Sequence, residues 1–283
     1  MSDKNDLPTI WEVSDDLWER IEPILAEAWP RRRGPGRPHI DWRKCLNGII
    51  YHLRTGCQWH ALPAQFGDDS SVHRWFQRWC EGGVMQRIWA NLVAECDELK
   101  EVYWDWQSAD GCMGKARHGG DQVGKNPTDR GKKGTKRSVV VDEQGGPLGV
   151  VIDGANRNDT KLLEATIEAI VVERPDPEEH EQHLCLDKGY DNPTGREAAS
   201  NAKYTPHIRR IGEEKQAVKD KHPDGKPRRW VVERTLSWLN RCRAILVRYA
   251  KKGRNYLGLV QLACGLIWYR RLFRVNALRE FAF

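Results

Sequence analysis

From about residue 102 onward, short apolar runs alternate with amphipathic segments, and this alternation restricts the fold more than any other feature of the sequence. The apolar runs at residues 102–110 and 183–187 each end in an aspartate. Two further runs, at 136–142 and 148–153, flank the segment EQGGP, which is typical of a hairpin turn. Strands that alternate with helices build a sheet covered by those helices, so this part predicts an α/β domain.

Amphipathic patterns predict the helices between these strands. Residues 158–172 form one, which begins at Asn158 or Asp159, and residues 192–202 and 230–247 form two more. A last short strand is predicted at 204–208. The order is therefore strand, hairpin, helix, strand, helix, strand, helix, which predicts a mixed sheet flanked by helices with the topology of the RNase H-like fold.

The first part of the chain is built differently. Ten of its 13 tryptophans lie within the first 106 residues, and they fall on apolar stripes, which indicates core positions. A helical pattern runs from residue 40 to 56, a short segment from 58 to 66 follows, and a second helix begins after Gly67. The apolar face of this second helix comprises Val72, Trp75, Phe76 and Trp79.

The outer face of that second helix carries polar side chains of the kind that read base edges. They are Arg74, Gln77 and Arg78. Two helices joined by a short segment and a turn, with such a face, indicate an all-α helix-turn-helix DNA-binding domain. An ordinary helical bundle with a solvated polar face is the alternative.

The two patterns divide the chain into a helical domain at residues 1–98 and an α/β domain at residues 102–283. Within the first, residues 31–38 read RRRGPGRP and form a basic linker that contains Arg31, Arg32, Arg33 and Arg37. Its two prolines and its lack of apolar side chains exclude a packed helix. The linker is either a solvated connector or an arm that follows DNA phosphates.

Several classes of protein are not expected. The start of the sequence has no basic-then-apolar signal pattern. The longest apolar stretch, residues 256–269, is too short to span a bilayer and predicts a buried helix. The eight cysteines form no CxxC pair, which favours scattered thiols in a reducing cytoplasm.

Three acids occupy positions that such a fold would bring together. Asp110 and Asp187 end predicted strands, and Glu233 lies one turn into the helix at 230–247. Three close carboxylates repel one another unless a hard cation neutralises them, and two Mg²⁺ ions, or Mn²⁺ in their place, suit oxygen ligands and phosphodiester chemistry.

Each of these acids also has a simpler interpretation. Asp110 competes with Asp105, and either can face solvent at a strand end. Asp187 can cap the turn at Gly189, and Glu233 can form a surface ion pair with Arg229 or Arg234.

The charge distribution favours a nucleic-acid partner. The chain carries a net charge of +6. Residues 114–137, which include Lys132 and Lys133, hold eight Lys and Arg against two Asp. Residues 207–254 hold fifteen Lys and Arg against five acids. Such one-sided charge beside the three acids predicts a nucleic-acid substrate.

Three blocks of this sequence resemble bacterial insertion-sequence transposases with a DDE catalytic triad, closest to insertion-sequence family five. They are Asp110-Gly111, the segment LDKGYD that contains Asp187, and the segment RWVVERT with WLNR after it. The N-terminal segments GCQWHALP and VHRWF are similar to the helical DNA-binding region of that family. The resemblance covers about residues 33–272.

The resemblance implies a DNA transposase that binds terminal inverted repeats and target DNA as duplexes, cleaves and joins strands, and pairs two ends as a homodimer. Asp110, Asp187 and Glu233 would hold two Mg²⁺ ions, and Arg229 matches the Arg-x3-Glu element of the family. Asn240 stands where the family often has Lys or Arg, and Arg241 follows it. Arg234 and Arg241 join the expected DNA contacts. A bacterial transposase of this kind is expected in the cytoplasm, at the nucleoid.

Two alternatives remain at this point. One is a DNA-binding regulator that derives from a transposase and has lost catalysis. The other is an RNase H-like nuclease or resolvase that does not join strands.

Overall fold

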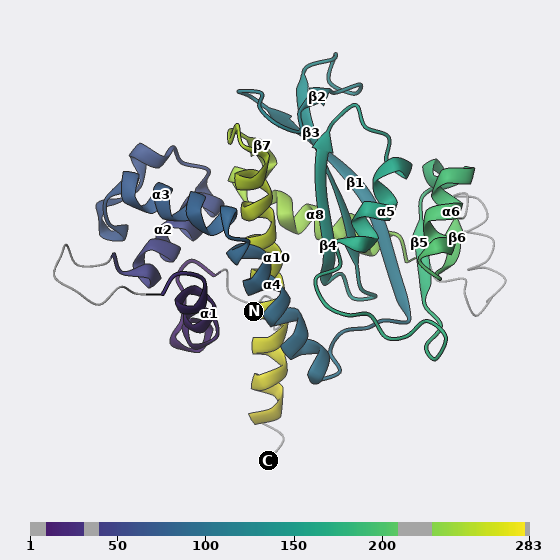
Figure 1. The fold of residues 1–283 in the computed structure, drawn as a ribbon, viewed down its shortest axis with the longest axis horizontal. Coiled ribbons are helices and arrows are strands. Elements are labelled where there is room, and N and C mark those ends of the chain that lie inside the picture. Colours follow the sequence, from purple (N-terminus) through teal and green to yellow (C-terminus); the bar gives the residue numbers. More distant parts are fainter. Residues whose placement is uncertain (1–9, 31–39, 209–227, 281–283) are drawn as a thin grey trace, which may run out of the picture.

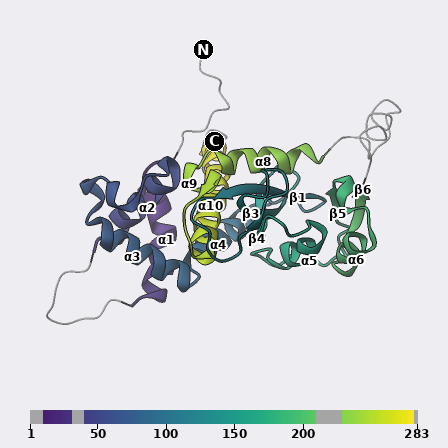
Figure 2. The same ribbon diagram turned by 90° about the horizontal axis from the view of Figure 1, so that it is seen from above.

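The computed structural model describes residues 10–30, 40–208 and 228–280, with side chains described as far as Val275. A group of helices lies at one end of the molecule and a mixed sheet at the other, and two helices, α4 and α10, stand between them (Figure 1). Figure 2 shows that helix α8 covers one face of the sheet, whereas α5 and α6 cover the opposite face.

The helical part consists of four α-helices and two 3-10 turns among the described residues. They are α1 (Asp15–Ala28), α2 (Trp42–Thr55), the turns η1 (Trp59–Ala61) and η2 (Ala64–Phe66), α3 (Asp69–Glu81) and α4 (Val84–Glu98).

Side-chain caps determine where these helices begin. Ser14, Asp41 and Asp68 each accept a hydrogen bond from the backbone N–H three residues on. At the end of α2, Gly56 takes the left-handed conformation, with φ of 67°. The helices predicted at 40–56 and after Gly67 are therefore α2 and α3, and the short segment between them forms the two 3-10 turns.

The second part contains the strands β1 (Trp106–Ala116), β2 (Gly124–Lys125), β3 (Lys133–Val141), β4 (Pro147–Gly154), β5 (His183–Leu186), β6 (Thr205–Ile208) and β7 (Val247–Arg248). Its helical elements are α5 (Thr160–Glu168), the turn η3 (Lys188–Tyr190), α6 (Pro193–Asn201), α8 (Trp230–Asn240), α9 (Arg243–Leu246) and α10 (Gly253–Glu280).

The main strands lie in the order β4-β3-β1-β5-β6. Strand β3 is antiparallel to both of its neighbours, whereas β1, β5 and β6 are mutually parallel. The short strand β2 extends the free edge of β3 beyond β4. This arrangement confirms the predicted α/β class and the RNase H-like mixed sheet.

Several predicted boundaries are wrong, among them the start of the first strand, which is Trp106 rather than residue 102. Strand β1 does not end at Asp110 but continues to Ala116, because antiparallel pairing with β3 extends as far as Lys115 and Gly134. The helix predicted at 230–247 ends at Asn240, since Cys242 is extended and α9 begins after it. Helix α5 ends at Glu168 rather than at residue 172.

The two parts share one apolar core. Helix α10 packs on α4 and α3 as well as on β4, and the long apolar stretch within it is buried, as predicted. Trp89 of α4 and Trp268 of α10 both donate a hydrogen bond to the carbonyl oxygen of Pro147, with N–O distances of 3.1 and 2.6 Å.

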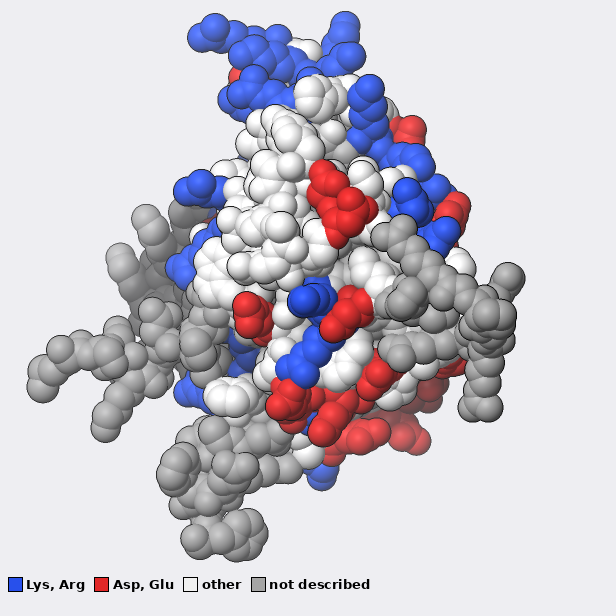
Figure 3. Space-filling model, turned by 90° about the vertical axis from the view of Figure 1, so that its left-hand side faces the viewer, with Lys and Arg blue, Asp and Glu red and all other residues white. Residues whose placement is uncertain are grey.

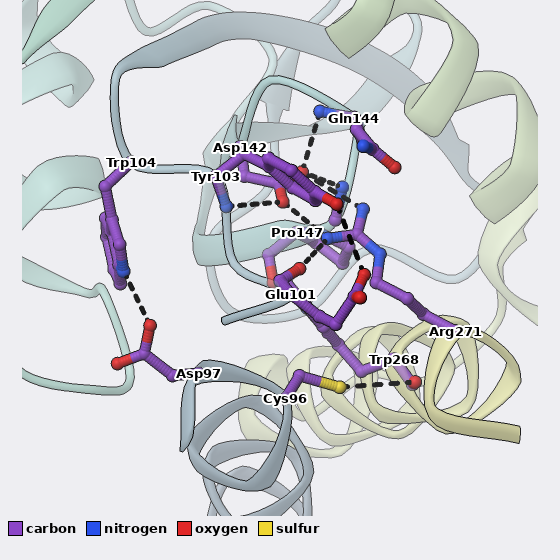
Figure 4. Close-up of polar contacts among 12 residues, drawn as sticks. Cys96, Asp97, Glu101, Tyr103, Trp104, Asp142, Gln144, Pro147, Trp268 and Arg271 are labelled. Atoms are coloured by element: carbon purple, nitrogen blue, oxygen red, sulfur yellow. Dashed lines mark hydrogen bonds and ion pairs between the residues drawn. The ribbon is translucent and has the colours of Figure 1, made fainter. Parts of the chain in front are cut away.

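A buried ion pair fastens α10 to the hairpin between β3 and β4 (Figure 4). Asp142 is inaccessible to solvent. Its carboxylate accepts hydrogen bonds from Arg271 and from the backbone N–H groups of Gly146, Gln144 and Tyr103. With so many donors, the buried charge is well compensated.

All eight cysteines are free thiols, in agreement with the sequence analysis. No helix within the described ranges is long and apolar enough to cross a bilayer.

Candidate active site

The parallel pairing of β1 with β5 brings the two aspartates together. Ser108 of β1 pairs with Cys185 of β5, so Asp110 and Asp187 are each two residues beyond this pair. Side chains two residues apart on a strand share a face. The register therefore places both carboxylates side by side where β5 ends, although Asp110 itself lies in the middle of β1.

Helix α8 lies along the same face of β1. At its start, the hydroxyl of Ser108 donates to the carbonyl oxygen of Arg228, with an O–O distance of 3.2 Å. At its end, the amide of Asn240 contacts the sulfur of Cys112 at 3.9 Å. Ser108, Asp110 and Cys112 alternate along one face of β1, so Glu233, within α8, lies over the strand near Asp110.

The electrostatics of Asp110 show that the acids interact. Burial, which is the largest cause, and the negative charges of Asp187, Asp159 and Glu233 together raise the pKa of its carboxyl to about 6. A hydrogen bond from the N–H of Gly111, with an N–O distance of 2.7 Å, opposes this shift. The three acids singled out from the sequence therefore do come together.

The contacts expected from the simpler interpretations of Asp187 and Glu233 are also present. Asp187 accepts a hydrogen bond from the N–H of Gly189, and a guanidinium nitrogen of Arg229 lies 3.4 Å from a carboxylate oxygen of Glu233. Asp105, the competitor of Asp110, precedes β1 and pairs with His180 at 2.8 Å.

A fourth acid, Asp159, adds its negative charge to those that raise the pKa of Asp110, and the sequence did not indicate this placement. The sequence pattern indicates a helix cap at Asn158 or Asp159, but the side chain of Asp159 makes no cap bond. Instead, one of its oxygens accepts from the ammonium of Lys136 at 2.8 Å. Gly111 permits this approach, because a Cβ atom there would collide with the other oxygen, Oδ1.

The signal for Asp159 in the sequence was the pair Asn158-Asp159. Asn158 accepts from the N–H of Thr160 at 3.0 Å and so caps the following helix by itself. The carboxylate of Asp159 is therefore not needed as a cap and can pair with Lys136.

The chemistry of these donors suits a divalent cation. Three carboxylates lie close enough to Asp110 to raise the pKa of its buried carboxyl, and Oδ1 of Asp159 is buried without a hydrogen-bond partner. Carboxylate oxygens are the ligands that Mg²⁺ and Mn²⁺ prefer. In the described parts of the chain, however, no three His, Cys, Asp or Glu side chains form a ready cage for a metal ion.

The expected DNA contacts of the helical domain have different environments. Arg74 and Arg78 of α3 are exposed. Gln77 is partly buried, and its side chain contacts His73 at 3.3 Å and accepts from Lys252 at 3.1 Å. It is therefore not free to read a base without giving up these contacts. The linker residues Arg31, Arg32, Arg33 and Arg37 lie outside the described residues.

The expected contacts of the α/β domain also differ. Lys132 and Lys133 are exposed beside β2, and Arg241 is exposed at the end of α8. Arg234 instead lies between the rings of Trp230 and Trp238, 4.5 and 4.8 Å from their centroids. It also donates to the carbonyl oxygen of Gln144 at 2.7 Å, so its first role is structural.

The strand order and the helices on both faces place the second part of the chain in the class of RNase H-like catalytic domains. Residues 104–268 match the family model described as "Transposase DDE domain", and residues 13–89 match "Putative transposase of IS4/5 family". The chain belongs to the DDE-domain transposases.

The chain is also similar to particular proteins. It is 32% identical over 163 residues to a putative transposase for insertion sequence element IS402 of Burkholderia cepacia, a match that covers 56% of this chain and 74% of the relative. It is 33% identical over 118 residues to an uncharacterized 16.2 kDa protein of the same element, covering 41% of this chain and 80% of the relative. A solved catalytic domain of Mos1 transposase is 14% identical, with a TM-score of 0.30, over 65% of this chain and 90% of the other.

Membership of this family shows an insertion-sequence transposase that acts on DNA. Of the readings considered from the sequence, the inert regulator and the nuclease without strand joining are not favoured.

Proposed function

We propose that Asp110, Asp187 and Glu233 are the catalytic carboxylates of this transposase and that they hold two Mg²⁺ ions, for which Mn²⁺ can substitute. The observation that carries the proposal is their convergence from two parallel strands and one helix onto a single face of the sheet. When bound, the ions activate water or a 3′-hydroxyl and stabilise the leaving oxygen of the phosphodiester.

The side chains themselves have distinct tasks in this scheme. Asp110 has a pKa of about 6, so it is mostly ionised at neutral pH and can accept a cation. Lys136 donates to one oxygen of Asp159, and the other oxygen, Oδ1, lies against Gly111. Arg229, paired with Glu233, keeps a cation at the rim, where a guanidinium can donate to a DNA phosphate.

The DNA substrate would be the terminal inverted repeats of the element, and then the target DNA. Arg74 and Arg78 are the exposed cations of α3 available to a duplex. Because two ends must be joined in one event, we propose that a homodimer forms in the DNA complex. Its place of action would be the nucleoid in the cytoplasm.

The test uses Asp187→Asn and a duplex that carries an end of the element encoding this chain. Binding should survive and Mg²⁺-dependent cleavage should disappear, because the amide cannot replace the carboxylate at a cation. The matched control is Asp191→Asn, an aspartate four residues on that pairs with Arg196; it should cleave normally.

Cleavage retained by Asp187→Asn would remove this residue from the mechanism. If the parent chain binds ends without cutting them, it is a regulator. If it cuts but does not join pre-cut ends to a target duplex, it is a nuclease.

A further inference from the structure

Exposed cations gather at the end of the sheet where β1, β2 and β3 extend beyond the helices. They include Lys115, Arg117, Lys125, Arg130, Lys132 and Lys133. Figure 3 shows this end, at the top of the view, as a nearly continuous basic surface. The two acids of the same region are occupied, since Asp129 lies near Lys115 and Lys132 and Asp121 accepts from the N–H of Gly253.

This end is joined to α3 by the segment that precedes α10. Lys252 donates to Gln77 at 3.1 Å, and Arg254 pairs with Glu81 at 2.7 Å, so the start of α10 lies beside α3. On the other side, the carbonyl oxygen of Lys251 accepts from the N–H of Asp121 at 3.0 Å. The segment therefore bridges helix α3 and the end of the sheet that carries these cations.

A buried arginine holds this bridge in place. Arg248 is 1% exposed. Its guanidinium donates to Oγ1 of Thr135 at 2.7 Å and to the carbonyl oxygens of Asp121 and Ala250 at 2.6 and 2.8 Å. These partners lie on β3, on the loop after β1 and on the segment before α10, so one side chain fixes three segments relative to one another. A surface fixed in this way loses little entropy when it binds.

The outer side of the bridge remains uncovered. Tyr249 is 53% exposed and its ring lies 5.6 Å from that of His118. Arg117, Lys133 and Lys251 are exposed and form no ion pair with any described residue. A fixed row of unpaired cations with hydrogen-bonding aromatic rings among them suits a polyanion of regular spacing.

We propose that Arg74 and Arg78 of α3, Lys251 and Lys252, and Arg117 and Lys133 form one basic track that binds the phosphates of duplex DNA. The proposal rests on the proposed function, because the duplex would be the one whose end reaches the acidic site. Arg117 lies seven residues beyond Asp110 along the chain, or about 23 Å at the rise of a strand. The end of the sheet that carries Arg117 should thus contact the duplex about 7 base pairs from the cleaved bond.

The experiment measures binding of an end duplex at several salt concentrations with a variant that lacks three cations of the track. The substitutions are Arg117→Ala, Lys133→Ala and Lys251→Ala. Each lost phosphate contact removes about 0.9 from the slope of log K against log salt, so the slope should become shallower by about 2–3. The matched control removes three exposed cations on the α5 and α6 side: Lys161→Ala, Arg196→Ala and Lys203→Ala. Its slope should equal that of the parent.

A hydroxyl-radical footprint adds a positional readout. The track variant should lose protection about 7 base pairs from the cleaved bond and keep its protection elsewhere, and its melting temperature should match that of the control. Equal slopes for the two triple variants, or an unchanged footprint, would overturn the track. That result would leave the proposed function intact if the parent still binds and cleaves ends, so the two failures are distinguishable.

Discussion

Replacing Asp110 by asparagine should stabilise the metal-free protein while it abolishes cleavage. Burial and three neighbouring carboxylates raise the pKa of Asp110 from 3.8 to about 6. A carboxyl whose pKa is raised on folding destabilises the folded state as the pH rises through the interval between the two values. This loss in the free energy of unfolding is absent well below pH 4 and complete above pH 6.

The magnitude follows from the size of the shift. A difference of about 2.2 in pKa corresponds to about 3 kcal/mol at pH 8. At pH 5 the folded carboxyl is already mostly protonated, and the same linkage leaves about 1.6 kcal/mol. Asp110→Asn should therefore raise the free energy of unfolding by up to about 3 kcal/mol at pH 8 and by about half of that at pH 5.

Denaturant unfolding at both pH values measures this gain, with Glu164→Gln on the exposed face of α5 as a control that should change nothing. Added Mg²⁺ should stabilise the parent and leave the variant unaffected, because binding to the folded state alone shifts the equilibrium. A variant no more stable than the parent at pH 8, or a gain that does not depend on pH, would refute the picture of crowded carboxylates.

Two further substitutions test the frame around the site. Gly111→Ala should displace Asp159 and weaken its pair with Lys136, at a cost of about 1–2 kcal/mol; in an Asp159→Ala background the same change should cost less, which a double-mutant cycle in denaturant measures. Arg271→Met should leave the carboxylate of Asp142 without its ion-pair partner and destabilise the chain by about 3 kcal/mol, seen as a lower denaturation midpoint; an unchanged midpoint would show that the backbone donors suffice.

The sequence predicted those parts of the site that depend on local pattern. The run ending at Asp187 is a short buried strand, and its apolar residues indicate both the strand and its end. The amphipathic stretch around Glu233 indicated the helix that carries it. The elements that carry Asp187 and Glu233 could therefore be predicted from the sequence, and the catalytic role of the acids stays a proposal.

The parts that failed depend on tertiary pairing. The position of Asp110 within β1 follows from the pairing of residues 111–115 with β3, where glycines and a lysine hide the strand pattern. The contact of Gln77 with Lys252 could not be predicted, because it joins residues far apart in sequence; base reading by Gln77 stays a prediction. Asp159 looked like a cap because only the folded chain brings it against Gly111.

The hydrogen bonds that hold helix α8 on the sheet do not involve the three acids of the candidate site. Helix α8 is attached to the sheet through groups other than these acids: Ser108 donates to the carbonyl of Arg228, Thr235 donates to that of Gly145 at 2.7 Å, and Asn240 accepts from the buried Arg137 at 2.6 Å. None of these bonds uses Asp110, Asp187 or Glu233. Replacing Asp110 by asparagine therefore reduces the repulsion among the carboxylates and removes none of the hydrogen bonds that hold α8. For this reason the free energy of unfolding of Asp110→Asn should rise rather than fall.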